Sequence, residues 1–423
     1  MEASVRILHT MPWTGFRMVV LCAMTLLRIG RIAAVGFLAT AAQGVAVGAA
    51  LAWHLRVPAT NGLPLVSVTY GGGQFVAVGD NGTVATSNDG ANWQAQQSGT
   101  SAELDRVAFA NGNFVAAGSP TNLFASINGT NWLQQNWVQI ATVLAGLDAA
   151  GDRFFLLAPD RNYGTAIYTS DNGTNWSRTA GWRDWTQIDP FAGGHLSGSA
   201  FGAGRYVCVG GWSEWRGQGP IVITSLDRTN WAFAKFDLLL SIVPVQFQRV
   251  IYGDHRFVAI GQAVGGSYIG YSDDGTNWTA VASGFPDLKS VTFGEGIYVA
   301  VGLFDTLLVS TDGANWTRTD LGTVADLSGV SFGAGTFVAV GAYGQIWQSD
   351  PVINLRMVGD TPVQLAIANQ AGRSCDIEAC DGLSATNEWQ RIATVQLTND
   401  PTIWADSEAS NRAQRFYRAV LRP

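Results

Sequence analysis

Two short segments of the chain combine tryptophan with charged residues, and they are the best candidates for chemistry. The first is GWRDW at 181–185, and the second is GWSEWRG at 211–217. Exposed indole rings offer flat apolar faces to sugars or cations, while carboxylates and guanidinium groups add directional hydrogen bonds. The residues that we expect to bind a ligand are Trp182, Arg183, Trp185, Trp212, Trp215, Arg216 and, from an equivalent loop, Tyr163. In the alternative interpretation, these tryptophans pack long loops against each other.

The same segments contain two carboxylates, Asp184 and Glu214. A pair of carboxylates at the right separation across a cleft can hydrolyse a glycosidic bond, so glycoside hydrolysis is the enzymatic alternative. The charges around the pair are mixed, which suits a solvated rim equally well. A binding or scaffold role needs fewer assumptions, and we therefore expect a non-catalytic protein that recognises a polysaccharide or a protein partner.

Other kinds of site find little support in the sequence. The four cysteines form no CxxC pair and no cluster with histidine, so we expect neither a metal site nor a cofactor. His195 and His255 are isolated residues, for which a structural role is the more common one. The net charge is −7 and no basic run interrupts the chain, which argues against a nucleic-acid partner.

A repeat organises the elements that must position these segments. An aromatic residue followed by a small apolar run recurs at intervals of 39 to 52 residues, as in FVAVG at 75–79 and at 337–341. A second string, typified by SNDGANW at 87–93, follows each copy except the last. It ends at Trp93, Trp132, Trp176, Trp231, Trp278 and Trp316. Each unit reads as four short strands joined by Gly-containing turns, which predicts a seven-bladed β-propeller.

The last repeat stops at Asp350 without its fourth strand, which would leave an open strand edge. Trp53 precedes Tyr70 by 17 residues, close to the 16 residues between Trp93 and Phe109 in a complete unit. The segment 52–57 is therefore expected to supply the missing strand and to close the propeller.

The repeated motifs SNDGANW (87–93) and STDGANW (310–316) resemble the Asp-boxes (BNR repeats) of secreted bacterial propellers in the sialidase-like superfamily. The usual Asp-box is one residue longer, so the resemblance is to a looser variant. It implies that Ser and Asp hydrogen-bond the hairpin and that Trp packs between strands, with no catalytic role for the repeated Asp residues. The mature part lacks the arginine motif that sialidase activity would need.

Composition changes after the repeats. Alternating segments at 363–367, 373–379, 390–397, 402–405 and 415–420 predict a small β-sandwich over 351–423. A segment such as DSEASN (406–411) before a terminal strand such as RFYRAV (415–420) makes this sandwich similar to the fibronectin type III-like C-terminal modules of secreted bacterial proteins. Cys375 and Cys380 are five apart, so a disulfide between them would need an intervening turn.

The first 50 residues read as a targeting segment. Arg28 and Arg31 precede an uncharged stretch, and small residues offer a cleavage site near Ala42. Translation from Met24 instead of Met1 is an alternative start of this segment. The alternative is a membrane anchor, because 32–53 carries no charge. We expect export of an all-β, seven-bladed propeller (51–350) with a C-terminal sandwich, as a monomer that is secreted, periplasmic or at the cell surface.

Overall fold

The computed structural model describes residues 51–56, 60, 62–118, 122–135, 144–160, 164–181, 194–214, 217–236, 245–263, 265–322, 326–352, 354–360, 362–368, 374–380, 389–399, 401–409 and 415–421. Strands form nearly all of the regular structure in this part of the chain. The helical segments with described bounds, η1 (Asp80–Gly82) and η2 (Ala342–Gly344), are short 3-10 turns. The all-β prediction is therefore confirmed. Leu51–Val352 form one compact unit, and the residues after Val352 form another.

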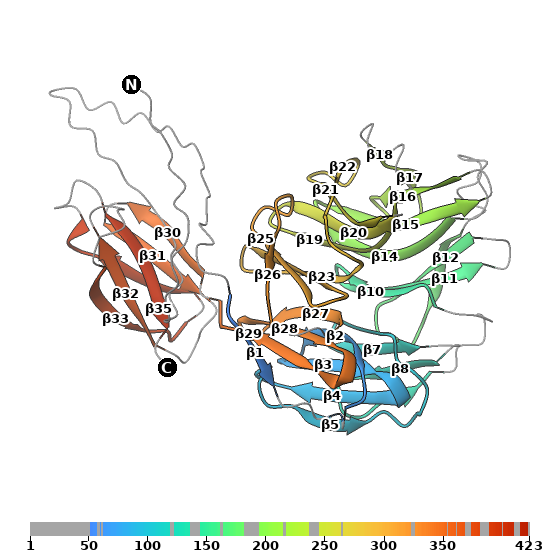
Figure 1. Ribbon diagram of the computed structural model, residues 1–423, viewed down its shortest axis with the longest axis horizontal. Helices are drawn as coiled ribbons and strands as arrows, with labels where there is room; N and C mark the ends of the chain where they lie inside the picture. The colour runs from blue at the N-terminus through green and yellow to red at the C-terminus, as the bar shows by residue number, and fades with distance from the viewer. Residues whose placement is uncertain are drawn as a thin grey trace. The chain divides into compact units, whose positions relative to one another are not determined.

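The Leu51–Val352 unit contains seven sheets in its described residues (Figure 1). The first sheet consists of β2 (Leu65–Gly71), β3 (Gln74–Gly79), β4 (Thr83–Ser87) and β5 (Gln94–Gln97), and the second of β6 (Arg106–Ala110), β7 (Asn113–Gly118), β8 (Asn122–Ser126) and β9 (Leu133–Gln134). The third sheet consists of β10 (Gly146–Ala150), β11 (Arg153–Asp160), β12 (Gly164–Ser170) and β13 (Ser177–Gly181). The fourth consists of β14 (Gly194–Gly202), β15 (Arg205–Glu214), β16 (Gly217–Ser225) and β17 (Ala232–Phe233). The fifth sheet consists of β19 (Gln246–Gly253), β20 (Arg256–Ala263), β21 (Gly266–Ser272) and β22 (Asn277–Ala282), with β18 (Lys235–Phe236). The sixth consists of β23 (Leu288–Gly294), β24 (Ile297–Gly302), β25 (Thr306–Ser310) and β26 (Thr317–Thr319). The seventh consists of β27 (Leu327–Gly333), β28 (Thr336–Gly341) and β29 (Ile346–Ser349), with β1 (Trp53–Arg56).

Two of the seven sheets contain a strand from outside their own repeat. In the fifth sheet, β18 pairs in parallel with β22 at the edge. In the seventh sheet, β1 pairs antiparallel with β29, with Trp53 opposite Ser349 and Arg56 opposite Ile346. This pairing occurs where the sequence predicted a missing fourth strand.

The second strand of each repeat carries a buried apolar run because neighbouring sheets cover both of its faces. In β3 the run from Phe75 to Gly79 is buried throughout, and β28 is buried from end to end. The hydrophobic clusters accordingly lie between consecutive sheets, and one of them joins the first sheet to the seventh, with Leu65 and Phe75 packed beside Val338 and Ile346.

Glycines at the ends of first strands allow adjacent sheets to approach. A β-carbon added at Gly71 would lie 2.0 Å from the ring of Phe109 in the second sheet. A β-carbon at Gly333 would meet the ring of Tyr70 at the same distance. The seventh and first sheets thus pack through the same contact as the first and second.

The C-terminal unit consists of two three-stranded sheets that share one core. One sheet is β30 (Asn354–Asp360), β31 (Val363–Ala368) and β34 (Thr402–Asp406), and the other is β33 (Gln390–Gln396), β32 (Ser374–Cys380) and β35 (Phe416–Leu421). The five predicted strands all correspond to strands here, but the prediction missed β30. Its sequence, NLRMVGD, places Arg356 beside Met357 and lacks a clean alternation of apolar and polar residues.

Two side chains of this C-terminal core bond to one buried carboxylate. Arg415 donates to the Oδ2 atom of Asp406 at 2.8 Å, and the Tyr417 hydroxyl donates to the same oxygen at 2.7 Å. Cys375 and Cys380 lie on one strand, β32, where both are buried and neither forms a disulfide.

Candidate functional site

The tryptophan-rich segments are only partly described by the structure. Trp182, Arg183, Asp184, Trp185, Trp215, Arg216 and Tyr163 lie outside the described residues. Glu214 ends strand β15. The isolated histidines are exposed: His195 lies on β14, and His255 lies in the turn between β19 and β20. The assignment of these segments to a ligand-binding site therefore stays a prediction.

The described part of the second segment is a strand and not the loop that the sequence suggested. The β15–β16 ladder continues to the pair Glu214–Gly217. Trp212 lies opposite Gly219, where a β-carbon would stand 2.6 Å from the indole Nε1 atom, so only glycine leaves room for the ring. Half-buried Trp212 packs against the hydrophobic cluster shared by the third and fourth sheets. Its described contacts are those of a packing residue.

The repeated SxDGxNW turns use their polar groups to hold the hairpin. In the first turn, Ser87 Oγ accepts from the N–H of Gly90 at 2.9 Å, and Asp89 Oδ1 accepts from the N–H of Asn92 at 2.8 Å. The indole Nε1 of Trp93 donates to the carbonyl of Gly90 at 2.8 Å. The same indole bond recurs at Trp132, Trp176, Trp231, Trp278 and Trp316. These side chains fix turn geometry, as the sequence predicted.

The hydrogen bonds also stabilise the ionised form of the turn aspartates. Partial burial opposes ionisation of Asp89 and of Asp312, but bonds from the Asn92 and Asn315 amides outweigh it and lower the pKa of each carboxyl to about 2. In Asp227 and Asp274 the pKa is lowered as well: bonds from Asn230 dominate for Asp227, while bonds from Asn277 overcome partial burial for Asp274. A general acid needs the opposite shift, so these residues do not suit proton transfer at neutral pH.

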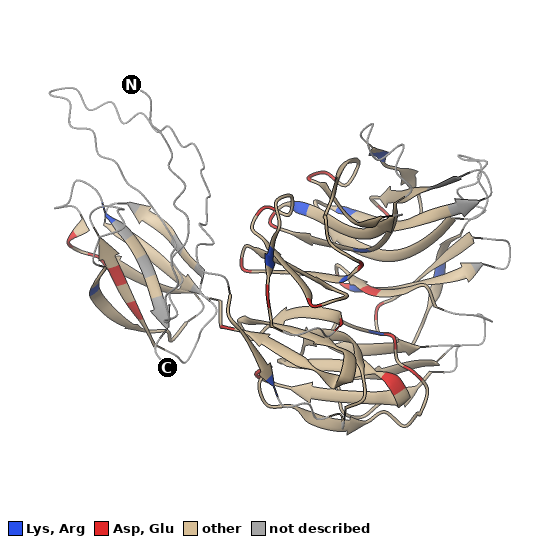
Figure 2. Ribbon diagram, in the orientation of Figure 1, with Lys and Arg blue, Asp and Glu red and all other residues tan. Residues whose placement is uncertain are grey.

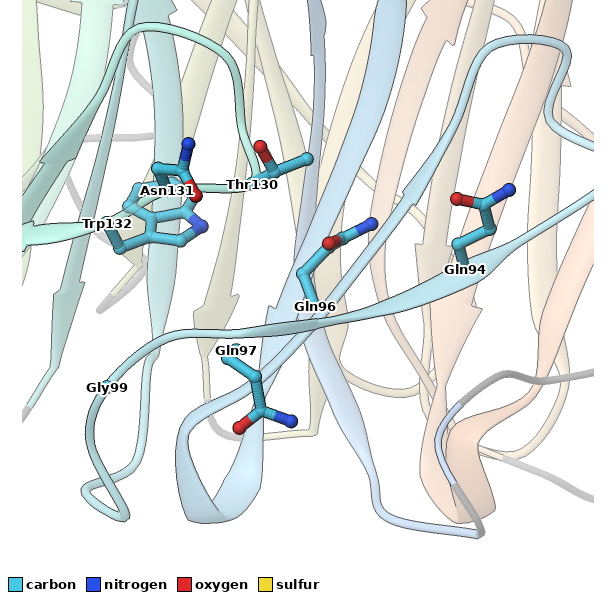
Figure 3. A pocket seen from close by; sticks show the side chains of 7 residues that line it. All are labelled: Gln94, Gln96, Gln97, Gly99, Thr130, Asn131 and Trp132. Atoms are coloured by element: carbon cyan, nitrogen blue, oxygen red, sulfur yellow. The ribbon is translucent and has the colours of Figure 1, made fainter.

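A shallow groove of about 660 Å³ lies between the first and second sheets. Figure 3 shows Gln94, Gln96 and Gln97 following one another along β5, beside the turn that carries Asn131 and Trp132. Thr130 and Gly99 complete the lining. We call this surface the glutamine groove.

The glutamine groove presents amide and hydroxyl groups and no ionisable side chain. Gln94, Gln97 and Asn131 are exposed, whereas Gln96 is half-buried and its Nε2 donates to Thr86 Oγ1 at 3.0 Å. Such a surface can recognise a polar ligand by hydrogen bonds, but it supplies no acid, base or nucleophile. The sequence signal was the run QAQQ at 94–97 in a position where other repeats carry different residues.

Other kinds of site were sought in the same described ranges. They contain no group of three or more His, Cys, Asp or Glu side chains that could hold a metal ion. None of their helices is long and apolar enough to cross a membrane.

No protein-family model and no curated protein matches the chain, so the resemblances to Asp-box repeats and to fibronectin type III modules stay predictions. Solved structures do match. YCF48 from Cyanidioschyzon merolae is 16% identical, with 70% of this chain and 98% of that chain covered and a TM-score of 0.53. YCF48 bound to D1 peptide is 18% identical, with 71% and 97% covered and a TM-score of 0.53. Virginiamycin B lyase from Staphylococcus aureus is 9% identical, with 72% and 100% covered and a TM-score of 0.58. At these identities the likeness concerns the fold alone, and it shows that this chain is a β-propeller protein.

Proposed function

We propose that this chain is an exported, non-catalytic β-propeller scaffold that binds an extended peptide segment of a protein partner. The observation that carries the proposal is the glutamine groove, whose exposed amides offer both hydrogen-bond donors and acceptors without any catalytic group. These are the groups that a peptide backbone pairs with.

The position of the groove favours a peptide over a sugar. β5 is the last strand of the sheet order β2-β3-β4-β5, and an extended peptide can add to such an edge. Sugar binding relies on exposed aromatic faces, but Trp132 is only 9% exposed and its indole nitrogen already donates to Gly129. The YCF48 structure with D1 peptide shows that another propeller of this general fold binds a peptide.

A rigid scaffold is part of the proposal, in the form of a seven-bladed ring closed by β1 and followed by a fibronectin-type-III-like sandwich. Contacts between the first strands of the seven sheets support the ring, because each first strand contacts that of the next sheet and β27 of the seventh sheet contacts β2 of the first. The sheet orders β30-β31-β34 and β33-β32-β35 support the sandwich, since they correspond to A-B-E and C′-C-F of immunoglobulin-like folds.

The test is binding of the full-length chain to an array of random peptides, followed by titration of the best peptide. Replacing Gln94, Gln97 and Asn131 together by Ala should weaken binding at least about tenfold, because each lost hydrogen bond costs about 1 kcal/mol. The matched control is Thr317→Ala with Thr319→Ala on β26, since Thr317 occupies the register position of Gln94 in the sixth sheet.

Equal binding by the groove variant and the control would overturn the groove assignment. A second variant separates the alternatives: Trp182, Trp185, Trp212 and Trp215 all replaced by Ala. Polysaccharide binding lost only in that variant would move the site to the tryptophan-rich segments. Glycoside hydrolysis lost in Asp184→Asn or Glu214→Gln would establish the enzymatic alternative instead.

Export is a separate part of the proposal and rests on the N-terminal sequence. N-terminal sequencing of the protein recovered outside the cytoplasm should find the chain starting near Gln43. An intact N-terminus in a membrane fraction would support the anchor.

A further inference from the structure

The loops between the second and third strands of the sixth and seventh sheets share an unusual backbone. In each loop, the residue two positions after the last glycine of the second strand lies in the left-handed region, with a φ of 54° at Phe304 and 56° at Tyr343. The corresponding residue of the first sheet is Asn81, with a φ of 52°. Two aromatic residues thus occupy a position where the first sheet has asparagine, and we call them the aromatic pair.

Both side chains of the aromatic pair are exposed. The exposed fraction is 65% for Phe304 and 73% for Tyr343, and no other aromatic residue with described burial is as exposed. A bulky residue in the left-handed region strains the backbone, whereas asparagine, as at Asn81, adopts it readily. Exposed rings gain little packing that could offset this strain. The aromatic residues therefore do not serve the stability of the fold, which points to a contact outside the chain.

Asp326 holds the two loops next to each other. Its Oδ1 atom accepts from the N–H of Phe304 at 2.9 Å, and its carbonyl accepts from the N–H of Ala342, the neighbour of Tyr343, at 2.9 Å. The two sheets are adjacent as well, since β27 contacts both β23 and β24. One residue thus bonds to both loops, and the backbone that carries the aromatic pair is positioned before any ligand binds.

Charged groups lie next to the aromatic pair. Arg318 on β26 is exposed, and its Nη2 atom donates to the carbonyl of Phe304 at 3.2 Å. Asp320 follows Arg318 after one residue, and Asp326 bonds to the same loop. Figure 2 shows both basic and acidic residues in the region of β26. The surroundings of the aromatic pair therefore supply charges of both signs.

The aromatic pair is not part of an extended apolar patch. Among the other exposed large apolar side chains with described burial, only Leu55 belongs to the sixth or seventh sheet, and it lies on the edge strand β1. The core of a stable protein interface needs a continuous apolar surface, and so does a lipid-binding surface. Two isolated rings beside hydrogen-bonding groups favour a smaller ligand that is both apolar and polar.

We propose that the aromatic pair binds a neutral carbohydrate, at a site separate from the glutamine groove. A sugar ring has apolar faces that stack on aromatic rings, and its hydroxyl groups form hydrogen bonds, here with the Arg318 guanidinium and the Tyr343 hydroxyl. Charges of both signs favour a ligand without net charge. Two rings at corresponding positions of adjacent sheets suit a chain of sugar units, with a different unit on each ring.

The experiment applies the full-length chain to a glucan, a mannan and a galactan, with polygalacturonate as an acidic comparison, and then titrates the polysaccharide that binds best. Phe304→Asn and Tyr343→Asn should each weaken binding at least about tenfold, because each removes a stacking face. Neither should lower the midpoint of thermal unfolding, because asparagine suits the left-handed backbone. Leu226→Asn is the matched control, since Leu226 is 67% exposed but follows β16 in the fourth sheet.

Binding to none of the three neutral polysaccharides would overturn the proposal, as would equal losses in Leu226→Asn and in the aromatic variants. A preference for polygalacturonate would overturn the assignment to neutral sugars. A lower unfolding midpoint in Phe304→Asn or Tyr343→Asn would show that the rings pack within the fold, against the proposal. The alanine variant of the glutamine groove and the quadruple tryptophan variant should both keep the binding. Peptide binding at the glutamine groove can therefore fail while sugar binding survives, and the reverse.

Discussion

Four of the six repeated turns carry an aspartate where the other two carry an asparagine. Asn128 Oδ1 accepts from the N–H of Asn131 at 2.9 Å, just as Asp312 Oδ1 accepts from the N–H of Asn315 at 2.8 Å. The chain therefore contains its own comparison between a charged and a neutral form of one turn. The geometry is shared, and what differs is the response to acid.

The lowered pKa values make stability depend on pH in the acidic range. A carboxylate whose pKa is lowered by folding stabilises the fold above its unfolded value of 3.8, and this contribution is lost as pH falls toward about 2. Asp312→Asn should keep the hairpin and remove less than a quarter of the dependence that the four aspartates produce together, because the pKa values of Asp227 and Asp274 are lowered further. Urea unfolding measured between pH 5 and pH 2 checks this, with exposed Asp152→Asn as the control. An unchanged pH profile in Asp312→Asn would contradict the assignment.

Strand β1 shows how an element far away in the chain completes a sheet. In addition to the backbone pairing of its four residues, two of its side chains reach the same region: His54 Nε2 lies 2.7 Å from Asp350 Oδ1, and Arg56 Nε donates to Gln348 Oε1 at 2.8 Å. Gln348 Nε2 in turn donates to the carbonyl of Asp89 in the first sheet at 2.6 Å. The edge of β29 is thereby covered, and the seventh sheet is tied to the first.

Removing β1 should therefore destabilise the propeller. A chain that starts at Val57 loses the backbone ladder and both side-chain links, and we expect a loss of about 2–4 kcal/mol in unfolding free energy. The bared edge of β29 should also promote association. A chain that starts at Leu51 is the control. Denaturant unfolding and light scattering measure the two effects, and equal stability of the two chains would refute a closing role for β1.

At the scale of the whole molecule, buried thiols report on each compact unit separately. Cys208 lies in the Leu51–Val352 unit, while Cys375 and Cys380 lie in the C-terminal one. Burial, helped by the nearby Asp148 charge, raises the pKa of Cys208 well above its usual value, and burial raises that of Cys375 to about 11. Thiolate is the reactive form, so both thiols are inert in the folded state.

This protection can be measured in a Cys22→Ser background. No thiol should react with a thiol-specific reagent at pH 8 under native conditions, and all three should react in denaturant. Following modification by mass spectrometry as denaturant increases then gives one unfolding transition for each unit. Rapid labelling of Cys208 in the native protein would show that its cluster between the third and fourth sheets is not packed as described.

Much of the fold could be predicted because the chain encodes it locally. The chain repeats buried strands such as FVAVG and seven-residue turns that contain Ser, Asp and Gly. Each such combination specifies a hairpin through residues that are close in sequence. The repeat and the all-β class could therefore be predicted from the sequence. Even β1 could be located, because its distance from Tyr70 matched that of a complete unit.

Only the tertiary structure decided which side chains meet. The glutamine groove joins β5 to a turn of the next repeat, and Arg106 interacts electrostatically with Asp148 and Arg249, which are far away in the chain. Trp212 similarly became a packing residue because Gly219 lies opposite it and lets the ladder continue. Turn and strand chemistry act over a few residues, whereas these contacts depend on register and on how closely adjacent sheets pack, which no local pattern specifies.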